Sequence, residues 1–163
     1  MMNDILSEEQ LACGGILVML VGPPGSGKST YAKNLESTDD NWLIVSPDVI
    51  RKKITGDESD QSRNDAVFGQ VYNELVSRLD AGFNVIYDAT NCRNTYRRKI
   101  LNVVNGHASN VICVVFTTSI AECLNRNNQR DRIVPENVIE RMYFTLKKHP
   151  PTIFEGYDII LKA

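Results

Sequence analysis

Six consecutive apolar residues, Ile16 to Val21, run directly into a glycine- and proline-rich octapeptide. An uninterrupted apolar run of this length is typical of a strand buried on both faces of a parallel sheet. A helix is expected next, from about Lys28 to Leu35. A buried strand, a tight loop and a helix in immediate succession predict the first unit of an α/β domain.

The rest of the chain alternates between the same two kinds of segment. Apolar runs predict further strands at Trp42–Val45, Phe83–Tyr87, Val111–Phe116 and Tyr157–Leu161. Helices are expected over residues 48–54, 65–79, 95–104 and 120–127, with a last one whose first position is Pro135. This alternation predicts a parallel sheet covered on both faces. Without repeats or linkers in the sequence, we expect a lead-in over residues 1–15, with capping-box spacing at 7–10, and one domain over residues 16–163.

Composition narrows the class of protein. The 163 residues are 42% apolar and 23% charged, with a formal net charge of −2. An acidic total argues against a broad surface for long nucleic acid, because that affinity comes from clustered Lys and Arg, but it leaves room for a local basic site. No apolar run approaches the roughly 20 residues of a membrane span, and the N-terminus does not have the pattern of a secretory signal.

The cysteines and histidines suggest no chemistry of their own. Cys13, Cys92, Cys113 and Cys123 form no Cys-x-x-Cys pair, so we expect reduced thiols in a cytoplasmic protein, with Cys113 in the core. Both histidines are expected at the surface; they are His107 and His149.

The octapeptide Gly22-Pro23-Pro24-Gly25-Ser26-Gly27-Lys28-Ser29 matches the phosphate-binding pattern G-x-x-x-x-G-K-[ST] at every fixed position. Its glycines let backbone N–H groups curl around a phosphate, and the following helix adds its positive end. We expect Lys28, on an exposed loop, to reach the β- and γ-phosphates, and Ser29 to bind Mg²⁺. The alternative is a strand-to-helix turn that carries Lys-Ser by chance and binds no phosphate.

Two acidic positions follow later strands, at the edge of a parallel sheet where ligands bind. Asp48 and Arg51 lie three residues apart after the second strand, where a carboxylate could take the proton of an attacking hydroxyl and a guanidinium could hold an acceptor phosphate. The alternative is a helix N-cap with a local salt bridge. Asp88 ends the third strand and is a candidate for the Mg²⁺ shell and the substrate site, or else a simple cap.

A basic stretch over residues 126–132, here called the arginine segment, carries Arg126, Arg130 and Arg132. Arg126 and Arg130 would face one way if the preceding helix continued. Guanidiniums near a triphosphate neutralise charge that develops in phosphoryl transfer. The alternative is a solvated basic helix end.

Taken in order, these pieces resemble the P-loop polynucleotide 5′-kinases, the kinase module of phage and bacterial nucleic-acid end-repair enzymes. The resemblance covers nearly the whole chain after residue 15. It is carried by Gly22–Thr30, Asp48 with Arg51, Asp88–Asn91, Arg126–Arg132 running into Val134-Pro135, and Pro150–Thr152 with Glu155-Gly156.

The resemblance implies a five-stranded parallel sheet of the nucleoside-monophosphate-kinase type. It also implies transfer of a phosphoryl group from ATP, with Mg²⁺, to the 5′-hydroxyl of DNA or RNA. Asp48 would be the general base, Arg51 would hold the acceptor's 3′-phosphate, and Arg130 would be a lid arginine. The implied catalytic residues are Asp48, Lys28 and Arg130. The implied ATP-binding residues are Gly22, Gly25, Ser26, Gly27, Lys28, Ser29, Thr30, Arg126 and Arg130.

Many members of that family carry a fused phosphatase or ligase domain. A chain of 163 residues leaves no room for one, so we expect any 3′-phosphatase or ligase partner to be a separate protein. Two other functions stay open: a small-molecule kinase acting on a nucleoside, nucleotide, sugar or antibiotic hydroxyl, and a nucleotide-gated binding module without catalysis.

Overall fold

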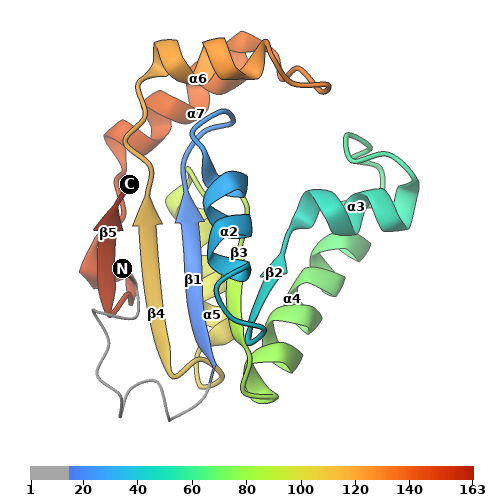
Figure 1. The fold of residues 1–163 in the computed structure, drawn as a ribbon, viewed down its shortest axis with the longest axis vertical. Coiled ribbons are helices and arrows are strands. Elements are labelled where there is room, and N and C mark those ends of the chain that lie inside the picture. The colour runs from blue at the N-terminus through green and yellow to red at the C-terminus, as the bar shows by residue number, and fades with distance from the viewer. Residues whose placement is uncertain (1–14) are drawn as a thin grey trace.

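A single sheet of five parallel strands organises the chain (Figure 1). The structure is a computed structural model that describes residues 15–163; Cys13 and the capping-box residues lie outside this range. The strands are β1 (Ile16–Val21), β2 (Trp42–Val45), β3 (Asn84–Tyr87), β4 (Asn110–Val115) and β5 (Ile159–Lys162), in the order β2-β3-β1-β4-β5. The predicted α/β class and five-stranded parallel sheet are therefore confirmed.

Helices cover both faces of this sheet. They are α2 (Lys28–Glu36), α3 (Pro47–Thr55), α4 (Asn64–Asp80), α5 (Asn94–Val104), α6 (Ile120–Asn127) and α7 (Glu136–Lys148), with a short 3₁₀ turn, η1 (Ile153–Glu155), before β5. No helix within residues 15–163 is long and apolar enough to cross a membrane.

The central strand β1 feeds two separate cores because successive side chains of a strand point to opposite faces. Leu17, Met19 and Val21 pack with residues of α4, α5 and α7. Ile16, Val18 and Leu20 pack on the other face, with residues of α2. Every residue of β1 is fully buried, which explains its continuous apolar sequence.

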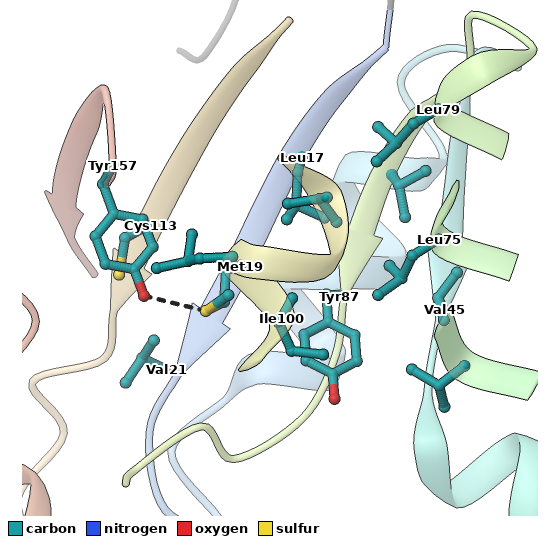
Figure 2. Close-up of a cluster of buried hydrophobic side chains, with 14 of the residues drawn as sticks. Leu17, Met19, Val21, Val45, Leu75, Leu79, Tyr87, Ile100, Cys113 and Tyr157 are labelled. Atoms are coloured by element: carbon teal, nitrogen blue, oxygen red, sulfur yellow. Dashed lines mark hydrogen bonds between the residues drawn. The ribbon is translucent and has the colours of Figure 1, made fainter. Parts of the chain in front are cut away.

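Figure 2 shows the larger core, where Tyr157 points from the β5 side toward Met19. The Tyr157 hydroxyl donates to the Met19 sulfur at 3.2 Å. The predicted start of the last strand at Tyr157 is therefore wrong: pairing with β4 begins at Ile159, because Tyr157 turns into the core and the Asp158 carboxylate accepts from the Val111 N–H at 2.7 Å.

Several other predicted boundaries shift by one residue, and for two of them the structure shows a reason. Pro135 immediately precedes the first residue of α7, and its extended backbone (ψ 134°) keeps it outside the helix. The third strand begins at Asn84 and not at Phe83, since the buried Asn84 side chain accepts from the Ile16 N–H at 3.0 Å.

Candidate active site

The phosphate-binding loop joins β1 to α2 and has a backbone conformation that favours glycine at two positions. Gly25 and Gly27 have φ angles of 81° and 101°, a region that other residues rarely adopt. A Cβ on Gly25 would also lie 2.3 Å from the Cys123 carbonyl oxygen. The loop therefore has the conformation that the sequence motif predicts, closed tightly against the start of α6.

Lys28 closes the loop from within. Only 7% of the residue is exposed, and its Nζ donates to the Pro23 carbonyl at 2.8 Å and to Ser26 Oγ at 3.4 Å. The expectation that Lys28 lies on an exposed loop is wrong, because the loop wraps around the side chain. Burial lowers the pKa of Lys28, an effect that the nearby Asp88 carboxylate opposes.

Neighbouring strands brace the loop at three points. The Gly22 N–H donates to the Thr90 carbonyl at 2.9 Å. The Asn91 amide donates to the Leu20 carbonyl at 2.8 Å, from a residue with φ of 50°, which asparagine tolerates. On the β4 side, the Thr118 hydroxyl donates to the Ser26 carbonyl at 3.0 Å. These contacts fix the loop before any ligand binds.

These features fit a nucleoside triphosphate with Mg²⁺. A buried ammonium inside a glycine cradle suits a polyphosphate, which would supply the missing negative charge. Mg²⁺ is usually held by substrate phosphates, waters and one or two protein oxygens. Ser29 is exposed in the first turn of α2, and no group of three or more His, Cys, Asp or Glu side chains gathers for a metal within residues 15–163. The assignments of Ser29 and Asp88 to Mg²⁺ stay predictions.

Asp88 follows β3 at the carboxyl edge of the sheet, as expected. Its N–H donates to the Val45 carbonyl at 3.0 Å, which ties the ends of β2 and β3 together. Its negative charge raises the pKa of Lys28 in the phosphate-binding loop, against the effect of burial. This edge therefore brings the segment that leads to Asp48 beside the phosphate-binding loop.

Asp48 and Arg51 form an ion pair on α3, with Arg51 Nη1 2.6 Å from Asp48 Oδ1. The carboxylate side chain is 59% exposed, whereas the guanidinium side chain is 5% exposed. Arg51 also donates to the Glu58 carbonyl and to Asn64 Oδ1, both at 3.3 Å, while its Nε is buried without a partner. The N-cap of α3 is Ser46, so the alternative of Asp48 as a cap is wrong.

The arginine segment begins in the last turn of α6 and leaves the helix after Asn127. The helix does not continue to Arg130, so the condition under which Arg126 and Arg130 would share a helical face is not met. The fully buried Asn127 side chain ends the helix by accepting from the Val134 N–H at 3.0 Å and donating to its carbonyl at 2.9 Å. Arg130 lies in the loop that these two bonds close.

The three arginines of this segment face different parts of the site. Arg126 pairs with Glu122 at 2.6 Å, and its Nη1 lies 3.5 Å from where a Cβ of Gly27 would be. Arg130 adds a positive field at Lys28 that lowers the lysine pKa further. Arg132 instead reaches α3, with Nη1 3.7 Å from Asp48 Oδ2. The side chains of the segment thus reach from the phosphate-binding loop to the Asp48 carboxylate. In Figure 1 the chain that follows α6 projects toward the side of α3.

Arg97 supports the site through buried hydrogen bonds, a role that the sequence did not indicate. It is fully buried and makes a two-bond ion pair with Glu155, at 2.7 and 2.8 Å. Its remaining N–H groups donate to the carbonyls of Asn91, Cys92 and His149. One side chain therefore ties the segment beside the phosphate-binding loop to His149, after α7, and to Glu155, at the end of η1.

Cys113 lies in the core and both histidines lie at the surface, as expected. Cys92, Cys113 and Cys123 are buried and free. Burial raises the pKa of Cys92 to about 11 and that of Cys113 to about 12, so both thiols are protonated at neutral pH. At the surface, the half-buried His107 ring contacts Asp80 at 2.8 Å, and His149 is exposed.

Comparison with known proteins agrees with this geometry. The L-seryl-tRNA(Sec) kinase of Methanococcus maripaludis is 29% identical over 142 residues, which are 78% of this chain and 51% of that protein. A chain in the structure of the Pnkp1/Rnl/Hen1 RNA repair complex is 28% identical, with a TM-score of 0.76 over 83% of this chain and 45% of that one. This chain thus spans about half the length of each.

A gluconokinase from Sinorhizobium meliloti shares the fold at 19% identity, with a TM-score of 0.54 over 91% of this chain and 81% of that one. The AAA_33 family, described as an AAA domain, matches residues 17–149. The chain therefore belongs to the AAA_33 family, and its fold is that of a P-loop kinase.

Proposed function

We propose that the chain transfers the γ-phosphoryl group of ATP to the 5′-hydroxyl end of a polynucleotide. One observation carries the proposal. Asp48 is an exposed carboxylate with a guanidinium on either side, Arg51 at 2.6 Å and Arg132 at 3.7 Å. A base flanked by two positive charges suits an acceptor hydroxyl that has a phosphate close by, as a nucleotide has.

The donor would bind on the phosphate-binding loop, with Lys28 on the β- and γ-phosphates and Ser29 on Mg²⁺. When bound, Mg²⁺ neutralises charge on the triphosphate. Asp48 would take the proton of the acceptor hydroxyl while that oxygen bonds to the γ-phosphorus and ADP leaves. Arg126 and Arg130 would hold the donor phosphates and stabilise the charge that develops during transfer.

Arg51 is suited to the acceptor's 3′-phosphate because its guanidinium is already fixed. Three contacts hold its Nη1 and Nη2 groups in place, so little side-chain entropy would be lost on binding. Its Nε is a buried donor without a partner, which costs about 1–3 kcal/mol until an acceptor reaches it. A phosphate oxygen would be such an acceptor.

The comparisons favour an RNA-linked acceptor. One similar structure belongs to an RNA repair complex, which supports RNA ends as the substrate and separate repair proteins as partners. The seryl-tRNA kinase likeness supports a second candidate, the hydroxyl of an amino acid esterified to tRNA.

Transfer from γ-labelled ATP to a panel of acceptors tests the proposal. The panel contains a nucleoside, a nucleoside 3′-monophosphate, a 5′-OH oligoribonucleotide, seryl-tRNA and gluconate. We expect the oligoribonucleotide and the 3′-monophosphate to be labelled far better than the nucleoside. Preferential labelling of seryl-tRNA would favour the second candidate, and labelling of gluconate or the free nucleoside alone would identify a small-molecule kinase.

Variants of the acceptor side make the test specific. Asp48→Asn should lose nearly all transfer yet still bind ATP, because the amide cannot take a proton. Arg51→Ala should erase most of the preference for the 3′-phosphate, a loss of about 1.5–3 kcal/mol. Arg51→Lys keeps the positive charge but lacks the planar guanidinium that donates two hydrogen bonds to one phosphate, so it should recover only part of that preference. Thermal unfolding of each variant controls for loss of fold.

A further inference from the structure

A cavity of about 180 Å³ lies between the start of α5 and the middle of α7, and none of its lining residues has been assigned to catalysis or to ATP binding. Its polar wall is formed by Thr90, Arg93, Tyr96 and Arg141. Cys92, Met142 and Thr145 complete it, and none of its lining residues is acidic. In a chain of net charge −2, a hollow with two guanidiniums and no carboxylate in its lining is suited to an anion.

An aromatic platform stands beside these charges. Tyr96 is 55% exposed, and the Arg93 guanidinium lies over its ring, with Cζ 5.7 Å from the ring centroid. Neither Arg93 nor Arg141 forms an ion pair with a carboxylate anywhere in the described chain. Both are exposed and available to a ligand.

A cationic hollow beside an exposed aromatic ring is how proteins hold single-stranded nucleic acid. Phosphates lie against arginines, and bases stack on aromatic or guanidinium planes. Thr90 and Thr145 add hydroxyls that can bond to phosphate or ribose oxygens. A small uncharged acceptor would make no use of this combination.

The cavity lies at the same edge of the sheet as the proposed transfer site. Its Thr90 accepts from the Gly22 N–H of the phosphate-binding loop at 2.9 Å. Two residues earlier, the Asp88 N–H is bonded to the end of β2, the strand that leads to Asp48. The segment from residue 88 to residue 92 therefore connects the acceptor end of the site to the cavity without leaving this edge.

We propose that this cavity is a second acceptor subsite, which binds a phosphodiester and stacks a base of the nucleic-acid strand downstream of its 5′-terminal nucleotide. The inference rests on the proposed 5′-kinase function and adds a length preference to it. Arg93 and Arg141 hold the backbone phosphate, and Tyr96 carries the base. Short acceptors that end at the first 3′-phosphate do not reach it.

The test compares two acceptors, a nucleoside 3′-monophosphate and a 5′-OH hexaribonucleotide, in five variants. Arg93→Ala, Arg141→Ala and Tyr96→Ala should each raise the KM for the hexanucleotide by about tenfold and leave kcat and the KM for the monophosphate unchanged. Tyr96→Phe should keep the hexanucleotide KM, because the ring remains. Arg98→Ala is the matched control: it removes the same charge from an exposed position on α5 that does not line the cavity, so neither KM should change.

The outcomes separate this inference from the proposed function. Unchanged hexanucleotide KM in all three alanine variants overturns the subsite, as does an equal rise for both acceptors. If the wild type labels neither acceptor, the proposed function fails, and fluorescence anisotropy of a labelled hexaribonucleotide then decides the subsite alone. Binding that weakens about tenfold in Arg141→Ala but not in Arg98→Ala supports it, and equal binding in the two variants overturns it.

Discussion

Replacing Arg97 by methionine should be among the most destabilising single changes in this chain, although Arg97 lies outside the proposed reaction. The substitution keeps a long, flexible side chain in the core and removes the guanidinium. Five hydrogen bonds are lost at once: two to Glu155 and one each to the carbonyls of Asn91, Cys92 and His149.

The size of the effect follows from what is left behind. Glu155, whose side chain is 9% exposed, would keep a nearly buried negative charge without a partner, and removing one member of a buried ion pair costs about 3–5 kcal/mol. For a domain of this length, each kcal/mol shifts Tm by about 2–4 °C. We therefore expect Tm to fall by roughly 6–20 °C. The loss of about 3–5 kcal/mol is a large share of the free energy of unfolding of a typical domain, which is about 5–15 kcal/mol.

Thermal and urea unfolding, followed by circular dichroism, measure this directly. Arg97→Lys should fall between methionine and the wild type, because an ammonium keeps the charge but cannot make the two-bond contact. Glu155→Gln leaves a neutral partner, and the double variant Arg97→Met/Glu155→Gln should recover part of the loss, because no charge remains buried. A loss below about 1 kcal/mol in Arg97→Met, or no recovery in the double variant, would refute the reasoning.

Three further predictions concern the donor side. Lys28→Met should abolish transfer while raising Tm without nucleotide, measured by calorimetry. The sign follows from burial, which lowers the pKa of Lys28 in the folded state below its usual 10.5, so the charged form opposes folding at neutral pH. As pH rises through the lowered pKa toward 10.5, the wild type should therefore gain stability relative to the variant. Gly25→Ala should lose ATP affinity and about 1–3 kcal/mol of stability, because the φ of 81° is strained for alanine and its Cβ meets the Cys123 carbonyl; unchanged ATP titration would contradict this. Arg130→Ala should lower kcat by a larger factor than it changes the acceptor KM, and an unchanged kcat would place Arg130 on the acceptor side. In the wild type, the arginine segment should gain hydrogen-exchange protection when ATP and Mg²⁺ are added.

The conformation of the phosphate-binding loop could be predicted from the sequence because its determinants are local, whereas the burial of Lys28 could not. The octapeptide from Gly22 to Ser29 carries its own backbone geometry, and the apolar run before it can only be a buried strand. The carboxyl-edge positions of Asp48 and Asp88 also follow, since Asp88 comes directly after one short apolar strand and Asp48 lies three residues beyond the end of another. Strand order does not follow in this way; the resemblance supplied the fold type.

The remaining contacts depend on residues far apart in the sequence. Arg97 stands in the basic run Arg97-Arg98-Lys99, which gives no sign that its first member is fully buried, because its partner Glu155 is 58 positions away. The path of the arginine segment was also hidden. The path depends on Asn127, which ends α6 through its two hydrogen bonds to Val134. Nothing in the neighbouring sequence marks Asn127 for this role. Without that bend, Arg132 would not reach Asp48.

The position of each strand in the sheet bears on how proteins of this fold can diverge. The phosphate-binding loop follows the central strand β1, which is paired on both sides, whereas the acceptor helix α3 follows β2, an edge strand paired on one side only. Changes in the acceptor half can therefore accumulate at the margin of the sheet without disturbing the nucleotide cradle at its middle. A fold partitioned in this way can retain its phosphate-binding loop while the residues that follow the edge strand change.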